Sequence, residues 1–582
     1  MKTIKLLMKS LRENKKNTVL SILFVALEVV CECALPFVMA KLIDNSGVDW
    51  NSLLIYGGIL VVLATCALAF GIISGKRAAR AGAGFAANLR DDMFVKVQGY
   101  SFANIDKFSA SSLVTRMTTD ITNIQNAFSM IIRIAVRVPL MMIFSIIMAF
   151  VISPSLAWIF LACVPILGGI IVLIISKATP TFSRVFKRYD ALNNSVHENV
   201  KGIRVVKTYV REDYENKKFE KAADDVTNDF VHAEKIVAWL TPSMNFFMYV
   251  CYVIISVLGA YVITGKLGWG TLTTGDLSSL ITYGINILSA LMMLAMILIM
   301  ITMSVASAKR IAEVMEEEST LTNPDNALTT VADGSVDFNN VTFKYSDKAE
   351  NAVLSDIDLH IKSGETVGIL GGTGSSKTSL VNLISRLYDV TEGEVKVGGV
   401  NVKEYDLDTL RQNVAVVLQK NVLFSGTIEE NLKWGDENAT EEEMKKACEI
   451  AQADEYIRSF PEGYKTYLEE GGTNLSGGQK QRLCIARALL RKPKILILDD
   501  STSAVDTKTD ALIRKGLKET MPETTKIIIA QRISSIQDAD KIVVLDNGTI
   551  NGMGSHEELL KSNAIYKDIF ETQNKTGGND NE

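Results

Sequence analysis

Long apolar runs dominate the first half of the chain, whereas short alternating segments dominate the second half. Six of the apolar runs are long enough to cross a bilayer as helices, which takes roughly 20 residues each. They cover residues 18–43, 53–74, 130–152, 156–176, 240–264 and 277–307. Runs of this length are not typical of core helices in a soluble domain. The pattern therefore predicts an all-helical membrane domain over residues 1–314.

Positive charge is distributed unevenly over the connections between these runs. The connections at residues 44–51, 153–155 and 265–276 are short and carry little positive charge, whereas residues 76–100 and 177–235 are rich in Lys and Arg. An excess of positive charge marks the cytoplasmic side. We therefore expect a multi-pass plasma-membrane protein with both termini in the cytoplasm. The two long segments are polar and helix-prone, so the spans should continue as helices beyond the membrane.

Charged residues lie inside two of the predicted spans. Glu28 and Glu32 are one helical turn apart in the first span, and Arg133 and Arg137 have the same spacing in the third. Glu28 and Arg137 lie at matching depths, ~24 Å from the outer ends of their spans at ~1.5 Å per residue. We favour an ion pair between Glu28 and Arg137. The alternative is that Glu28 and Glu32 face a cavity and bind a cationic substrate.

The second half has the pattern of a soluble α/β domain. Residues 315–334 are acidic and polar and predict a linker, and residues 574–582 predict a disordered tail. Residues 335–573 between them contain the predicted strands, and a helical insertion is expected over residues 431–472. The predicted strands cover residues 336–345, 393–402, 415–418, 495–498, 527–530 and 542–545.

A glycine-rich loop between an apolar strand and a helix is the first candidate for chemistry. Its residues are Gly371, Gly372, Thr373, Gly374, Ser375, Ser376, Lys377, Thr378 and Ser379. Strand, loop and helix in this order match a phosphate-binding loop, in which backbone N–H groups surround the phosphates. Lys377 is expected to reach the β- and γ-phosphates of ATP, and the Thr378 hydroxyl to ligate Mg²⁺. Ser376 stands where the usual pattern has its second glycine.

Three further features complete a candidate ATPase site. An apolar strand ends in Asp499, which can hold Mg²⁺, and Asp500, which can polarise an attacking water. Gln419 follows another strand and can contact both the Mg²⁺ and the water. A second anion site is expected where a helix opens with the residues Leu475, Ser476, Gly477, Gly478 and Gln479.

With these motifs the chain resembles an ATP-binding cassette exporter with six spans fused to an ATPase. The resemblance implies a P-loop ATPase domain with an antiparallel β subdomain and a helical subdomain. It implies that Tyr345 stacks on adenine and that residues 475–479 are the signature motif. It also places Asp506 in the D-loop that begins at Ser503. Residues 103–120 resemble the first coupling region, and residues 198–207 the helix before the second, which in the family docks on the partner's cassette.

Two positions depart from the family pattern together. Asp500 stands in place of a catalytic Glu, and Gln531 in place of the switch His. A carboxylate one methylene shorter, misplaced by ~1 Å, can cost ~100-fold in rate. Because the signature motif is intact, the resemblance implies one half of a heterodimeric exporter, whose signature completes the partner's site. The alternatives are a slow homodimeric exporter and a membrane-bound ATP-binding sensor.

Composition narrows the set of partners. The net charge of −5 lacks the basic excess typical of nucleic-acid binding, so no nucleic-acid partner is expected. The seven cysteines show neither metal-site spacing nor a disulfide framework. The expected partners are membrane lipid, a homologous exporter chain and a small hydrophobic cargo. Four methionines of the sixth span, at positions 292, 293, 296 and 300, would suit such a cargo, although helix packing is the preferred explanation.

Overall fold

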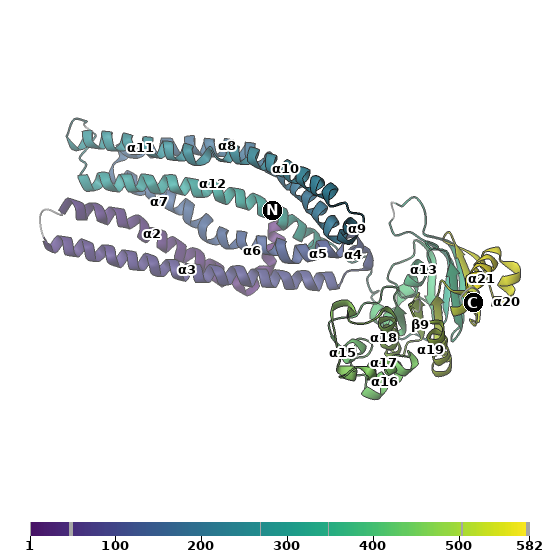
Figure 1. Cartoon of the computed structure of the whole chain (residues 1–582). Helices are drawn as coiled ribbons and strands as arrows, with labels where there is room; N and C mark the ends of the chain where they lie inside the picture. Colours follow the sequence, from purple (N-terminus) through teal and green to yellow (C-terminus); the bar gives the residue numbers. More distant parts are fainter. Residues whose placement is uncertain (1, 46–49, 268, 347–348, 502–503, 578–582) are drawn as a thin grey trace. The chain divides into compact units, whose positions relative to one another are not determined.

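The computed structural model describes residues 2–45, 50–267, 269–346, 349–501 and 504–577. The chain divides into two compact units (Figure 1). The first unit comprises Met1–Gln98 and Ser109–Glu317, and the second comprises Gly99–Phe108 and Glu318–Glu582.

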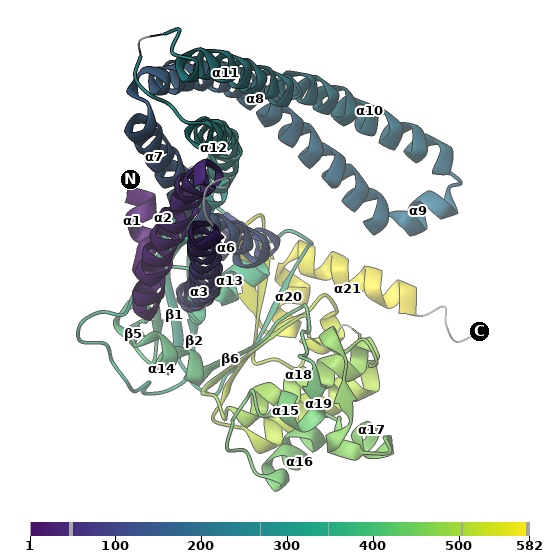
Figure 2. The ribbon, with the colours of Figure 1, turned by 90° about the vertical axis from the view of Figure 1, so that its left-hand side faces the viewer.

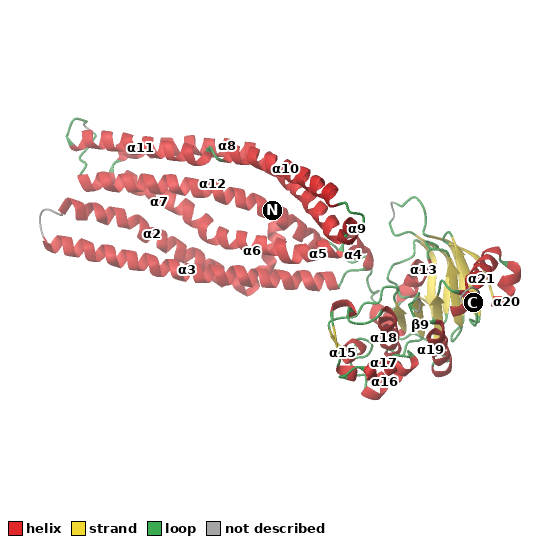
Figure 3. Ribbon diagram, viewed as in Figure 1, coloured by secondary structure: helices red, strands yellow, loops and turns green. Residues whose placement is uncertain are grey.

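Helices make up the regular structure described in the first unit (Figure 3). They are α1 (Lys2–Leu7), α2 (Lys15–Asn45), α3 (Trp50–Gln98), α5 (Ala110–Thr115), α6 (Ile121–Met130), α7 (Val136–Ile152), α8 (Pro154–Lys201), α9 (Ile203–Thr208), α10 (Glu212–Val237), α11 (Leu240–Ile263) and α12 (Thr274–Glu316), with a 3₁₀ stretch at Met8–Asn14 and π-helical stretches at Arg116–Asp120 and Ile131–Ala135. Six continuous helical stretches among the described residues are long and apolar enough to cross a membrane, which confirms the predicted number of spans.

The two basic connections are helical, as expected. Helices α3 and α8 contain 49 and 48 residues, which at ~1.5 Å per residue gives ~70 Å, far more than the ~30 Å of a hydrocarbon core. Helix α10 runs beside the second part of α8, and α9 joins the two at their far end (Figure 2). The helices that carry these apolar spans therefore continue as polar helical segments beyond the spans.

Three charged residues of the first and third spans form one cluster. Arg137 donates to Glu32 at 2.6 and 2.9 Å, and its other terminal nitrogen lies 3.4 Å from Glu28. Arg137 thus contacts both carboxylates, and its shorter contacts are to Glu32 rather than to Glu28. Burying an unpaired charge is costly, so one guanidinium between two acids supports a structural role for this cluster.

The second unit contains two main sheets (Figure 3). An antiparallel sheet has the order β2-β1-β4-β5, and a six-stranded sheet has the order β12-β11-β3-β10-β9-β6, parallel except for β12. The strands are β1 (Val336–Phe343), β2 (Leu354–Ile361), β3 (Thr366–Gly371), β4 (Glu392–Val397), β5 (Val400–Asn401), β6 (Val414–Val417), β7 (Gly426–Thr427), β8 (Tyr467–Leu468), β9 (Ile495–Asp499), β10 (Thr525–Ile529), β11 (Lys541–Asp546) and β12 (Thr549–Gly554). Strands β9 and β10 are buried along their whole length, as the apolar runs predict.

Helices cover the six-stranded sheet and form the predicted helical subdomain. They are α13 (Lys377–Ile384), α14 (Leu407–Asn413), α15 (Ile428–Leu432), α16 (Glu441–Ile450), α17 (Asp454–Ser459), α18 (Gly477–Leu490), α19 (Thr507–Thr520), α20 (His556–Ser562) and α21 (Ala564–Gly577). Helix α21 continues four residues into the segment 574–582, for which disorder was expected; residues 578–582 lie outside the described part. The expected fold, helical membrane domain plus α/β ATPase with two subdomains, is confirmed.

One boundary differs from the sequence-based division. Helix α4 (Phe102–Phe108) belongs to the second compact unit rather than to the helical one. The Asn104 side chain donates to the carbonyl of Glu318 and accepts from the backbone N–H of Thr320. Tyr388 donates to Asp106 at 2.7 Å. A domain boundary predicted from composition cannot take account of these polar contacts, because they join residues that are far apart in the sequence.

Candidate functional site

The expected phosphate-binding loop joins β3 to α13. The Lys377 ammonium group donates to the carbonyls of Gly371 and Gly372 at 2.8 and 2.7 Å and to the Ser375 hydroxyl at 3.1 Å. The loop thus wraps around its own lysine at the N-terminus of a helix, where backbone N–H groups favour anions. Burial lowers the pKa of Lys377, against the opposing effect of Asp499 and Asp500. A nearby anion would therefore compensate a desolvated ammonium group.

The structure explains why the usual pattern has glycine at the position of Ser376. Ser376 is the N-cap of α13 and has φ 70° and ψ 21°, in the left-handed region, and Gly374 has φ 86°. Left-handed backbone costs an L residue other than Gly about 1–2 kcal/mol. Ser376 adopts the loop conformation that a glycine would adopt, so the departure changes the energy of the loop rather than its shape.

Two of the three residues expected to contact Mg²⁺ meet at the end of β9, and the third, Gln419, contacts Asp500 instead. The Thr378 hydroxyl donates to Asp499 at 2.9 Å, and Asp499 is only 2% exposed. Burial raises the pKa of Asp499, and the neighbouring charge of Asp500 adds to the effect. A hydroxyl and a carboxylate are hard oxygen ligands of the kind that Mg²⁺ takes, so this pair fits the ion.

The two departures from the family pattern are in direct contact. The Gln531 carboxamide donates to Asp500 at 2.8 Å, and Gln419 donates to the same carboxylate oxygen at 3.4 Å. The parallel pairing of β9 with β10 brings residues 31 positions apart to one edge of the sheet. Asp500 has φ 48°, a left-handed backbone that Asp tolerates better than most residues. Its carboxylate is therefore oriented by two neutral amides.

Tyr345 contacts the helix that follows the phosphate-binding loop. Its hydroxyl is 2.8 Å from the Ser379 hydroxyl, and its ring makes edge contacts with Phe343 and with Tyr388. About half of the Tyr345 side chain (46%) remains exposed. An anchored, half-exposed ring beside the phosphate-binding loop is what stacking on adenine requires. Sequence reasoning missed Tyr388, although an aromatic shortly after the loop helix could have suggested a contact with Tyr345.

The signature residues form a separate helix tip. Ser476 is the N-cap of α18 and forms a capping box with Gln479, so the helix begins in a fixed orientation. A Cβ added to Gly477 would lie 3.5 Å from the Ala504 side chain, an ordinary contact. A Cβ added to Gly478 would lie 2.9 Å from the Ala504 carbonyl oxygen, which is too close. Gly478 therefore has a packing role in this chain, whereas the described residues leave room for a side chain at Gly477.

Asp506 is the N-cap of α19, and its carboxylate accepts from the backbone N–H of Thr509 at 2.9 Å. This hydrogen bond lowers the pKa of Asp506. The backbone N–H of Ala504 donates to Gln481 on α18, so the start of α19 and the signature helix are tied together. Ser503, the first residue of the expected D-loop, lies outside the described residues.

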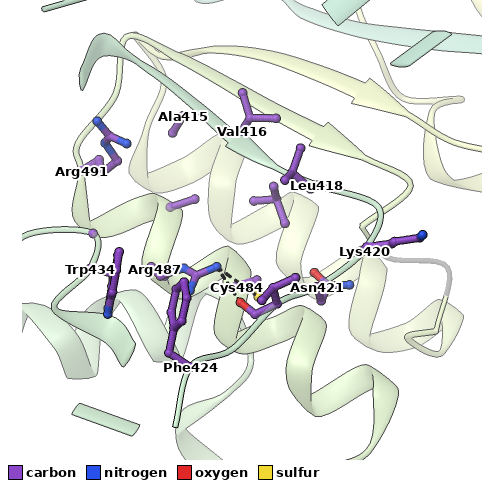
Figure 4. Close-up of a pocket in the computed structure, with 14 residues that line it drawn as sticks. Ala415, Val416, Leu418, Lys420, Asn421, Phe424, Trp434, Cys484, Arg487 and Arg491 are labelled. Carbon is purple, nitrogen blue, oxygen red and sulfur yellow. Dashed lines mark hydrogen bonds between the residues drawn. The ribbon is translucent and has the colours of Figure 1, made fainter. Parts of the chain in front are cut away.

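A groove that sequence reasoning missed lies between β6 and α18 (Figure 4). Its volume is about 310 Å³, and the rings of Phe424 and Trp434 stack along one side with their centroids 4.3 Å apart. Arg487 donates to the Val422 carbonyl within the groove, and Arg491 adds a second guanidinium. The lining residues come from segments about 70 positions apart, so no local pattern could have shown it.

Comparison with known proteins agrees with the geometry. The family of ABC transporter transmembrane regions matches residues 18–291, and the ABC transporter family matches residues 354–503. The ABC transporter ATP-binding protein YfiB of Bacillus subtilis (strain 168) is 35% identical over 556 residues, covering 95% of this chain and 96% of that protein. An ABC transporter ATP-binding protein of Mycobacterium tuberculosis (strain ATCC 25618 / H37Rv) is 34% identical over 575 residues, covering 98% of both chains.

A solved structure of a bacterial Atm1-family ABC exporter with ATP bound has the same fold. It superposes with a TM-score of 0.84 at 24% identity and covers 96% of this chain and 99% of the other. Fold, motifs and relatives agree along nearly the whole length of the chain. The chain therefore belongs to the ABC transporters in which a membrane-spanning region is fused to an ATP-binding ATPase domain.

Proposed function

We propose that this chain is one subunit of a heterodimeric, ATP-driven exporter of hydrophobic or amphipathic compounds. Its own ATP site binds nucleotide with Mg²⁺ and hydrolyses it slowly, and its signature motif completes the active site of a homologous partner chain. The protein resides in the plasma membrane with both termini and the ATPase domain in the cytoplasm. The Lys and Arg excess in residues 76–100 and 177–235 supports that orientation.

The main support for the proposal is the geometry around Asp500. This carboxylate is one methylene shorter than the family's glutamate, and its hydrogen bonds from Gln531 and Gln419 come from neutral amides. Neither amide can carry a positive charge, so neither can stabilise developing negative charge as a protonated His would. The phosphate-binding Lys377 and the Thr378–Asp499 pair are in place nevertheless. Intact binding groups beside a short general base favour binding over turnover.

The signature helix tip supports the shared-site arrangement. Ser476 and the first N–H groups of α18 form an anion-binding N-terminus, and the capping box fixes its orientation. Among the described residues, a methyl group at Gly477 would fit in ordinary contact with the Ala504 side chain at 3.5 Å. The glycine at this position is therefore explained by close approach of a ligand from outside, such as ATP held by the partner's loop.

The groove between β6 and α18 supports a second contact with the partner. It combines the stacked Phe424 and Trp434 rings with Arg487 (Figure 4). In this chain α9 is followed directly by Tyr209 and Val210, which are 72% and 80% exposed. We infer that the corresponding apolar turn of the partner docks into this groove, as the family resemblance implies for the second coupling segment.

Activity of the purified full-length chain in lipid nanodiscs tests the heterodimer. The proposal expects slow ATP hydrolysis for the chain alone and fast hydrolysis after co-expression with a homologous chain from the neighbouring reading frame. Gly477→Ala should nearly abolish the fast activity while leaving the thermal stability of this chain unchanged, because the added methyl group fits. Fast turnover by the chain alone would support the homodimeric exporter instead.

Transport distinguishes the exporter from an ATP-binding sensor. Inside-out vesicles containing both chains should accumulate a fluorescent amphipathic dye when ATP is added. Lys377→Ala in this chain, combined with replacement of the phosphate-binding lysine of the partner chain, should prevent it. ATP binding without any ATP-dependent accumulation, across dyes of different charge, would favour the sensor.

A further inference from the structure

The carboxy-terminal helix α21 carries a polar residue on its inward face. Tyr566, Phe570 and Gln573 follow a helical spacing and are at least partly buried, whereas Glu571 is exposed. Tyr566 is fully buried, and its hydroxyl lies 2.7 Å from the imidazole of His556. The Phe570 ring makes an edge contact with the same imidazole. These contacts anchor the helix and leave Gln573 facing the rest of the unit.

Gln573 contacts the segment that follows β10 through both ends of its carboxamide. Its oxygen accepts from the backbone N–H of Ile533 at 2.9 Å, and its nitrogen donates to the backbone carbonyl of Gln531 at 2.8 Å. The two backbone groups lie on either side of Arg532. One side chain therefore bridges this short turn, and using its donor and its acceptor together fixes the orientation of the carboxamide.

The bridged turn begins at the residue that orients Asp500. The Gln531 side chain donates to Asp500 at 2.8 Å, while its backbone carbonyl accepts from Gln573. We propose that Gln573 is a positioning residue of the ATPase site, through which α21 holds Gln531 on Asp500. The inference rests on the proposed role of Asp500 and Gln531 in hydrolysis. It goes further by making the last helix of the chain part of the machinery that sets the turnover rate.

The Gln573→Met variant tests this proposal, because Met has a similar length but lacks both hydrogen-bonding groups. In the full-length protein we expect the Ile533 amide to exchange with deuterium roughly 10-fold faster, since it loses its acceptor. The kcat for ATP should fall about 3–10-fold as the Gln531 side chain loses its fixed position. The KM for ATP should not change, because Lys377 and Tyr345 are untouched.

The matched control is Glu571→Ala, on the exposed face of the same helix. Among the described contacts it removes an exposed ion pair with Lys567 at 4.0 Å, and it should change neither the exchange of Ile533 nor kcat. Unchanged exchange and unchanged kcat in Gln573→Met would overturn the proposal. So would equal losses in Glu571→Ala, because they would indicate a general effect of the helix.

The Gln573→Glu variant should show a pH dependence of kcat, relative to wild type, that a purely structural role of Gln573 would not produce. The ionised carboxylate keeps the acceptor for Ile533 but places an oxygen against the Gln531 carbonyl, so kcat should be low at pH 8. Protonation restores the donor, and the activity relative to wild type should recover as the pH falls toward the glutamate pKa of about 4.3. A ratio that stays constant from pH 8 to pH 4.5, where about 40% of the glutamate side chains would be protonated at that pKa, would contradict the proposed hydrogen bond.

A double-mutant cycle separates this inference from the proposed function. If Gln573 acts through Gln531, the double variant Gln531→Ala/Gln573→Met should hydrolyse ATP no more slowly than Gln531→Ala alone. Losses that multiply would overturn the inference. If Gln531→Ala keeps the full wild-type rate, the proposed role of Gln531 fails first. If Gln531→Ala is slow and Gln573→Met is not, only the role of Gln573 fails.

Discussion

Replacing Asp500 with Glu tests the central chemical argument directly. The added methylene extends the carboxylate by up to about 1.5 Å, one carbon–carbon bond. If the present carboxylate is ~1 Å short, the barrier at this site contains about 2.7 kcal/mol of misplacement, since ~100-fold in rate corresponds to twice 1.36 kcal/mol. Part of this gain is offset, because residue 500 has φ 48° and Glu tolerates that backbone less well than Asp, at a cost of about 1 kcal/mol. We therefore expect Asp500→Glu to raise kcat at this site about 10-fold.

The assay is phosphate release by the full-length chain in nanodiscs, measured alone and with a partner chain. Asp500→Asn is the matched control, because it keeps the size of the side chain and removes the base; it should hydrolyse ATP more slowly than wild type. An Asp500→Glu rate equal to or below wild type, together with a slow Asp500→Asn, would refute the idea that side-chain length limits turnover. Equal rates for all three proteins would show that Asp500 is not the base at all.

Three other substitutions have expected outcomes that follow from the structure. Ser376→Gly relieves a left-handed serine (φ 70°) and should stabilise the ATPase domain by about 1 kcal/mol, seen as a melting temperature about 2–4 °C higher; no increase would mean that the loop is not strained. Arg137→Ala leaves Glu28 and Glu32 without their shared guanidinium and should lower the stability of the folded protein by about 3–5 kcal/mol, seen as loss of folded protein in detergent. A folded variant that selectively loses transport of cations would instead favour a substrate role for these acids. Tyr345→Ala should weaken ATP binding about 10-fold, since stacking a base on an aromatic ring contributes about 1–3 kcal/mol, and Tyr345→Trp should restore it; equal affinities in a fluorescent-nucleotide titration would exclude stacking.

Local patterns were sufficient for the architecture and for most of the candidate site. The six spans follow from run length alone, and the continuation of α3 and α8 beyond the membrane follows from the change to polar, helix-prone residues. The phosphate-binding loop was recognisable despite Ser376, because strand, loop, Lys377 and helix keep their order. Patterns of this kind are encoded within about 25 consecutive residues, so they need no knowledge of the fold.

Domain boundaries that depend on tertiary packing were harder to predict from the sequence. The short helix α4 lies in the middle of a helical sequence but packs within the ATPase unit through Asn104 and Asp106. Its partner Tyr388 is 282 positions from Asp106 along the chain. The conformation of Ser376 is a similar case, because a serine before a helix ordinarily predicts a right-handed or extended cap.

The sequence by itself determined that this is a membrane-spanning ATPase chain with a short carboxylate and a neutral amide in two catalytic positions. Only the tertiary structure decided that these two side chains touch, that Arg137 binds two acids rather than one, and that Gln573 bridges the turn after β10. The physical reason is the order of the strands. Placing β9 beside β10 brings Asp500 within hydrogen-bonding distance of Gln531, and packing of α21 adds a side chain from 42 positions further along the chain. Such contacts depend on three-dimensional neighbours, which no stretch of consecutive residues contains.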